Sequence, residues 1–248
     1  MKPLFPLLVA ILLACCSCDV PEQKQSGDKP SEASAETQQN ASPGQAVNSE
    51  QPIDVEQEKK QVKLCYENFI SAIRAQDGKK VVQCVDQKTK NYYAQILEWA
   101  LTAKRDEVEN MPLIDRVGVL TMRFKIPAEQ LRGMNGEDIL AYAVDNGMVG
   151  GHARSGTFTV DGNSGKMDVI TLPGESGMFF GFNKENGEWK IDWTSVFPAS
   201  KLELEIAIRT RKLTQVPQLT ENEFIFESLK RMSPDQPPTD DLWNPVGK

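Results

Sequence analysis

The sequence predicts an α+β protein in which N-terminal helices pack on a curved antiparallel sheet and a helical extension follows. Two patterns support this fold class. Between residues 166 and 194, apolar side chains alternate with polar ones, which is the period of a strand with one buried face. Between residues 61 and 150, apolar residues instead recur every three or four positions, as along amphipathic helices. Because an apolar sheet face must be covered, we expect these helices to pack on it.

Each helix is justified by its apolar spacing and by its ends. In the first, Val62, Tyr66, Phe69 and Ile73 form one stripe, and Asp77-Gly78 breaks the pattern. Prolines at 112 and 127 end the third and fourth helices. The predicted helices are 57–75, 79–85, 91–109, 113–124 and 136–146.

Strands follow the helices, after a glycine-containing segment at 147–151 where the period changes from 3.6 to 2. Residues 157–160 and 166–171 flank a loop at 161–165 that is typical of a hairpin. A second turn region at 172–177 leads into two strands rich in Phe and Trp, joined by a turn at 183–187. In the last strand, Trp189, Ile191 and Trp193 are expected on the buried face.

The C-terminal part is predicted to be helical. Residues 202, 204, 206 and 208 are Leu or Ile and alternate as in a strand, but 199–213 consists of strong helix formers, which favours a helix. Thr220-Glu221-Asn222-Glu223 is a capping box that begins another helix. The tail after Ser233 is rich in proline, and its Trp243 is expected to dock on the domain.

The N-terminus has the features of a secretory signal peptide. Lys2 precedes an apolar run from Leu4 to Leu13 that is too short to span a membrane. Leu12-Leu13-Ala14-Cys15 resembles the bacterial lipobox, which implies an acylated Cys15 and a lipid anchor in the cell envelope, facing the periplasm or the exterior. The alternatives are an ordinary cleaved signal, or acylation at Cys16 or Cys18.

Composition divides the chain into four segments: 1–14 as signal peptide, 15–56 as tether, 57–197 as the α+β domain and 198–248 as the extension. The tether has no aromatic residue from Asp19 to Glu56, which predicts disorder. It holds six acids more than lysines, so the residues after Glu56 account for only −2 of the net charge of −7. A nearly neutral domain lacks the basic surface that nucleic-acid binding uses.

The cysteines and the single histidine indicate no metal site and no cofactor. Cys65 and Cys84 lie on the apolar faces of their predicted helices, so a disulfide between them and two buried free thiols both remain open. With His152 they do not form a ligand set of known spacing. The glycines at 147–151 are not followed by the Lys-Ser or Lys-Thr of a phosphate-binding loop.

Three features of the chain resemble the nuclear transport factor 2-like superfamily, which includes SnoaL-like cyclases and ketosteroid isomerases. They are the first helix ending in Arg74-Ala75-Gln76-Asp77-Gly78, the short helix 79–85, and the closing hairpin 187–193. The resemblance covers 57–196. It implies a cone-shaped fold with a pocket between sheet and helices, where some members use a carboxylate with tyrosine donors. The long helical region at 91–146 and the extension depart from the family pattern.

Candidate catalytic residues are His152, Tyr92, Asp168 and Asp192, and no local motif brings them together. His152 has the side chain whose ordinary pKa suits proton transfer, but its glycine-rich flanks indicate a loop. Asp168 and Asp192 alternate with apolar neighbours, which predicts that they face solvent. Tyr92 and Tyr93 are adjacent on one helix, which predicts one core and one exposed tyrosine. Five aromatic residues are expected in the core: Phe179, Phe180, Phe182, Trp189 and Trp193.

Three functional hypotheses follow. The first is a membrane-anchored envelope lipoprotein whose domain binds a small apolar ligand or a protein partner. The second is an enzyme of isomerase, dehydratase or cyclase type that uses a pocket carboxylate with His152 or Tyr92. The third is a scaffold with a filled cone, whose C-terminal helices form a dimer or partner interface. A pocket with converging polar groups, an open apolar cavity or a filled interior distinguishes them.

Overall fold

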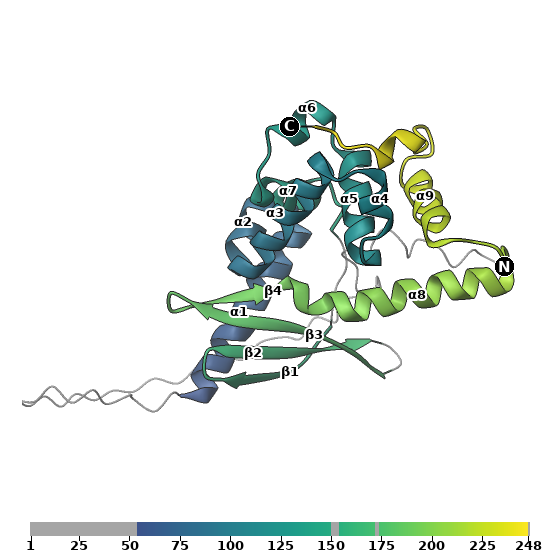
Figure 1. Ribbon diagram of the computed structural model, residues 1–248. Helices are drawn as coiled ribbons and strands as arrows, with labels where there is room; N and C mark the ends of the chain where they lie inside the picture. Colours follow the sequence, from purple (N-terminus) through teal and green to yellow (C-terminus); the bar gives the residue numbers. More distant parts are fainter. Residues whose placement is uncertain (1–53, 150–153, 172–173, 248) are drawn as a thin grey trace, which may run out of the picture.

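The predicted α+β class is confirmed by the computed structural model, which describes residues 54–149, 154–171 and 174–247 (Figure 1). Helices form most of the described part of the chain, and one antiparallel sheet lies at one end of the helical assembly. No helix in these ranges is both long and apolar enough to cross a bilayer. The helices are α1 (Val55–Arg74), α2 (Gly78–Cys84), α3 (Gln87–Thr102), α4 (Arg105–Glu109), α5 (Leu113–Lys125), α6 (Ala128–Arg132), α7 (Gly136–Asp145), α8 (Phe197–Thr214) and α9 (Glu221–Met232).

Side-chain caps explain where several of these helices begin. Asp54 accepts hydrogen bonds from the amides of the first turn of α1, and Asp77 does the same for α2. Thr220 and Glu223 form the predicted capping box of α9, which is therefore confirmed. The sequence-derived boundaries of α1, α2, α5 and α7 agree with the structure to within two residues.

The sheet has four antiparallel strands in the order β1-β2-β3-β4. They are β1 (Arg154–Asp161), β2 (Ser164–Thr171), β3 (Gly174–Glu185) and β4 (Glu188–Asp192). The two predicted hairpins around 162 and 186 are confirmed. Trp193 is buried but lies in a short 3-10 helix after β4, so its prediction as a strand residue is wrong; its amide binds the hydroxyl of Thr89 instead of a neighbouring strand.

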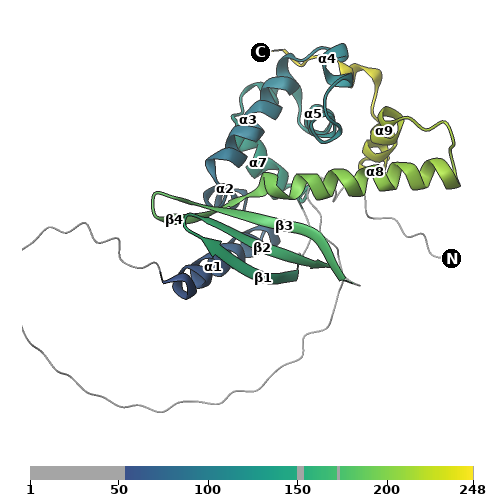
Figure 2. The same ribbon diagram turned by 60° about the horizontal axis from the view of Figure 1, so that its bottom comes forward.

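Aromatic side chains fill the space between α1 and the sheet, which both figures place against each other (Figures 1 and 2). Phe69 of α1 packs edge-on against Trp193, with 4.9 Å between ring centroids, and Tyr66 lies 5.5 Å from Phe180. Phe182 and Trp189 are also buried, as predicted, whereas Phe179 is 36% exposed and its prediction as core is wrong. The interior under the sheet is therefore occupied by the chain's own side chains.

Glu58 lies at one edge of this aromatic cluster and binds Trp189, which belongs to it. Its carboxylate accepts hydrogen bonds from the Trp189 indole at 2.6 Å and from the Lys184 ammonium at 2.7 Å. These two hydrogen bonds hold the pKa of Glu58 below its usual value, the lysine having the larger effect. The start of α1 is thereby tied to β3 and β4.

The prediction of one helix over 91–109 is wrong. The structure has α3 and α4, separated at Ala103 and Lys104. The reason is Arg123 of α5, whose guanidinium binds the carbonyl oxygens of Trp99, Ala100 and Ala103 at 3.0, 2.9 and 2.6 Å. These side-chain contacts satisfy the carbonyl groups at the end of α3, so the helix ends there.

The C-terminal extension packs back on the helices. The predicted docking of Trp243 is confirmed: it is 3% exposed and stacks on Phe226 of α9, with 5.5 Å between centroids. Beyond it, the amide of Gly247 donates to the carbonyl of Leu101 at 2.8 Å. Arg116 of α5 donates to Glu221 at the start of α9 at 3.0 Å. The extension is thus part of the same packed core as α3 and α5.

The predicted helix after Pro198 is confirmed as α8, and its structure explains the strand-like alternation. Leu204 and Ile208 are buried, whereas Leu202 and Ile206 are 57% and 54% exposed on the opposite face. A helix with apolar residues on two opposite faces produces a period close to two in that short window.

Candidate functional site

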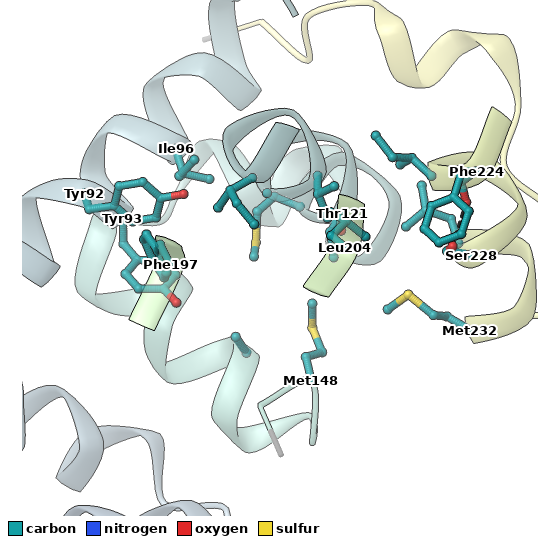
Figure 3. A pocket seen from close by; sticks show the side chains of 17 residues that line it. Tyr92, Tyr93, Ile96, Thr121, Met148, Phe197, Leu204, Phe224, Ser228 and Met232 are labelled. Atoms are coloured by element: carbon teal, nitrogen blue, oxygen red, sulfur yellow. Dashed lines mark hydrogen bonds between the residues drawn. The ribbon is translucent and has the colours of Figure 1, made fainter. Parts of the chain in front are cut away.

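An apolar pocket, called here the helical pocket, lies among the helices and not under the sheet. Its lining comes from α3, α5, α7, α8 and α9 together with Met148, and no described strand residue contributes. Figure 3 shows Tyr92, Tyr93 and Phe197 on one side and Phe224, Ser228 and Met232 on the other. The lining residues are Tyr92, Tyr93, Ile96, Ile114, Val117, Gly118, Thr121, Met122, Ala143, Met148, Phe197, Leu204, Phe224, Ile225, Ser228, Leu229 and Met232.

Helical periodicity places the lining residues of each helix on the face that is directed to the pocket. On α9, Phe224, Ser228 and Met232 follow one another at spacings of four, so all three project from one face. On α5, Gly118 allows a close approach to α3, because a Cβ built there lies 3.1 Å from Cδ1 of Ile96. The pocket is thus formed by both the predicted domain 57–197 and the extension 198–248.

The polar groups of the pocket are hydroxyls. Tyr92 donates to Oδ1 of Asp115 at 3.0 Å, and Ser228 donates to the carbonyl of Phe224 at 2.6 Å. Tyr93 and Thr121 are 6% and 4% exposed, and neither hydroxyl forms a hydrogen bond with the part of the chain that the structure describes. Both hydroxyl oxygens retain some accessible surface, so both adjoin free space.

Burial keeps the phenols of the pocket protonated. It raises the pKa of Tyr92 far above its usual value, and the negative charge of Asp115 raises it further. Burial alone raises the pKa of Tyr93. The pKa of Asp115 is also raised by burial, and its hydrogen bond from Tyr92 partly opposes that effect. At neutral pH both tyrosines are therefore neutral hydrogen-bonding groups.

Both tyrosines line the pocket, so the prediction of one core and one exposed tyrosine is wrong. Their rings pack edge-on, with 5.6 Å between centroids, and Tyr92 also contacts Phe197 at 4.7 Å. Tyr92 thus packs on the first residue of α8, while Tyr93 beside it is buried. Tyr92 and Asp115 form a carboxylate–tyrosine pair of the type that the enzyme hypothesis requires, although Asp115 itself does not line the pocket.

The other candidate residues lie outside the helical pocket. Asp168 forms an ion pair with Lys166 at 2.7 Å on the open side of β2, and its side chain is 38% exposed, as predicted. Asp192 is 9% exposed, so its prediction as a solvent-facing residue is wrong: it accepts hydrogen bonds from Lys88 and Thr194 at 2.8 and 2.6 Å. It lies at the last position of β4, where the alternation ends. His152 and Cys15 lie outside the described residues.

Cys65 and Cys84 are free thiols in the structure and line one surface groove between α1, α2 and β4. The thiol of Cys65 donates to the carbonyl of Trp189 at 3.1 Å. Burial raises the pKa of Cys65 to about 12 and also raises that of Cys84, so both are thiols at neutral pH. Of the two alternatives from the sequence, the structure has the free thiols.

No cluster of three or more His, Cys, Asp or Glu side chains that suits a metal ion occurs among the described residues. The chain matches no family model, no curated protein and no solved structure. The resemblance to the nuclear transport factor 2-like superfamily therefore stays a prediction from the sequence.

Sequence reasoning did not locate the helical pocket. The apolar stripes of α3, α5, α8 and α9 were each recognisable, but periodicity does not tell which stripes face one another. One usable signal was the methionines, since three of the chain's eight, Met122, Met148 and Met232, gather at this pocket.

Proposed function

We propose that this chain is a bacterial envelope lipoprotein, anchored through acylated Cys15, that binds a small apolar molecule in the helical pocket. The observation that supports binding is the lining, in which the described residues are almost all apolar and none is charged. An apolar cavity with a few hydroxyl groups is typical of small-molecule sites.

The pocket has a free volume of about 50 Å³ without a ligand. Small-molecule pockets usually hold roughly 300–1,000 Å³, so a ligand must displace side chains as it enters. Met122, Met148 and Met232 are suited to this, because methionine is unbranched and rearranges at low cost. Binding is thus expected to move these three side chains in particular.

The ligand site of this proposal differs from the one that the family resemblance implies. That resemblance places a pocket between sheet and helices, where Phe69, Phe180 and Trp193 pack against one another. The helical pocket suits a ligand better because free space and unpaired hydroxyls occur together there.

Methionine-methyl NMR tests the binding proposal. Titration of the ¹³C-methyl-labelled full chain with octane is expected to shift the resonances of Met122, Met148 and Met232, assigned by single Met→Leu variants. Met167 of β2 is the internal control, since it is 0% exposed and lies outside the helical pocket. Saturable shifts confined to the three pocket methionines support the proposal. Absence of shifts, or equal shifts at Met167, would refute it.

The anchor is tested separately. The Cys15→Ser chain, expressed in a bacterial host, is expected to move from the membrane fraction to the soluble fraction, because the acylated sulfur is absent. Cys16→Ser and Cys18→Ser are the matched controls and are expected to remain with the membrane. If Cys15→Ser remains membrane-bound, the lipid anchor at this residue is wrong.

A further inference from the structure

The two unpaired hydroxyls in the helical pocket carry information about the ligand beyond its apolar character. An apolar ligand that displaced solvent from such a hydroxyl without replacing its hydrogen bond would leave the group unpaired, at a cost of roughly 1–3 kcal/mol. Tyr93 lies on α3 and Thr121 on α5, and both belong to the lining. Two such groups in one cavity point to a polar atom in the ligand.

The other two hydroxyls of the pocket already donate hydrogen bonds within the protein. Tyr92 donates to Asp115, and Ser228 donates to the backbone of its own helix. Tyr93 and Thr121 therefore hold the protons that remain available to a ligand. Because burial raises the pKa of Tyr93, its phenol keeps that proton at neutral pH. The pocket offers donors, and the complementary ligand atom is an acceptor.

Charge considerations exclude an anionic acceptor. The described lining contains no cation that would compensate a buried negative charge, and desolvating an isolated carboxylate is costly. The carboxylate of Asp115 behind Tyr92 adds repulsion. Lys125 contacts the lining residue Met232, but its ammonium is directed to the carbonyl of Met232 and the hydroxyl of Ser233 at 3.3 and 2.7 Å. That ammonium is occupied at the end of α9 and does not line the pocket.

We infer that the ligand of the helical pocket is an uncharged apolar molecule with a hydrogen-bond acceptor of the ketone, aldehyde or ester class, for which the hydroxyls of Tyr93 and Thr121 are the available donors. This inference rests on the proposed function, since it names the ligand class of the same site. The apolar part of the molecule lies among Met122, Met148, Leu204 and Met232.

Three probes of equal chain length test this inference: octane, 2-octanone and octanoate, each titrated into the full chain at pH 8 with the methionine methyls as readout. In the unmodified chain, 2-octanone is expected to bind about tenfold more tightly than octane, as one hydrogen bond provides. Octanoate is expected to bind more weakly than 2-octanone by at least about tenfold, because its charge is desolvated without a partner.

The double variant Tyr93→Phe/Thr121→Val removes both hydroxyls with little change in volume. It is expected to lose the preference for 2-octanone while its affinity for octane stays within about twofold, since the apolar contacts remain. Tyr142→Phe is the matched control, because Tyr142 donates to the carbonyl of Lys125 outside the lining and its loss leaves the preference unchanged.

The outcomes separate the two proposals. If octane binds but 2-octanone shows no preference, or keeps its preference in the double variant, the ligand class is wrong and apolar binding stands. Tighter binding of octanoate also overturns the ligand class and implicates Lys125. If no probe shifts the pocket methionines, the proposed function itself fails.

Discussion

Replacing Arg123 by methionine is expected to lower the free energy of unfolding by about 3–5 kcal/mol. Arg123 is 7% exposed, and its guanidinium donates five hydrogen bonds, all to backbone carbonyls. Three of these acceptors belong to the end of α3, and two belong to Leu242 and Trp243 in the tail. Methionine fills a similar volume but donates nothing. The carbonyls of Ala103, Leu242 and Trp243 then lose their hydrogen bonds, and those of Trp99 and Ala100 keep only the amides of Ala103 and Val246.

Arg123 is unusual because its charge is compensated by carbonyl dipoles and not by a carboxylate. Burial lowers its pKa to about 10, which still leaves the side chain protonated at neutral pH. The carbonyl ends of α3 carry the negative end of that helix dipole, which favours a cation there. One residue thus ends α3 and holds the tail that carries Trp243.

Urea denaturation of the full chain measures this effect. Arg132→Met is the matched control: Arg132 also binds tail carbonyls, those of Val246 and Gly247, but at an exposed site. Its loss is expected to cost less than about 1 kcal/mol. Proteolysis provides a second measurement, since release of the tail in Arg123→Met is expected to accelerate cleavage after Ser233. Equal stability of the two variants would contradict the role given to Arg123.

Arg123 also illustrates which parts of the fold the sequence predicts. The periods of 3.6 and 2, the capping box at Thr220 and the turns of the hairpins are local patterns, and they located nearly every helix and strand. The end of α3 is bound by Arg123, which lies some twenty residues later in the chain, so no local sequence pattern can predict that contact. The single helix expected over 91–109 therefore failed where a tertiary contact overrides the local preference.

The candidate site shows the same limit. The sequence identified Tyr92 as a candidate, but its partner Asp115 lies on another helix, and their hydrogen bond is a result of packing. The pocket was expected beside the sheet, where large aromatic residues in fact fill the space. The sequence places residues of α9, such as Ser228 and Met232, in a separate extension, because the contacts of α9 with α5 are long-range.

Gly78 is a case in which a residue interpreted as a helix breaker has a packing role. It begins α2, capped by Asp77, and its amide donates to Oδ1 of Asp145 at 2.7 Å. A Cβ built at Gly78 lies 2.3 Å from the carbonyl oxygen of Ala141 and 2.5 Å from its Cα. Both are backbone atoms of α7, so no side-chain rotation relieves the overlap. Only glycine permits α2 and α7 to approach this closely.

Gly78→Ala is therefore expected to destabilise the chain by about 3 kcal/mol, because α2 must move away from α7 and its bond to Asp145 is strained. Gly133→Ala is the matched control: the nearest atom to its Cβ is 3.6 Å away, and alanine there is expected to leave stability unchanged or to raise it by up to about 1 kcal/mol. Urea denaturation of both variants, with equal m-values as a check on the unfolded state, measures the difference. If Gly78→Ala is as stable as Gly133→Ala, α2 and α7 do not pack at this distance in solution. A lower stability of Gly78→Ala would instead show that α2 and α7 are in close contact. This contact positions α7, which contributes Ala143 to the wall of the helical pocket.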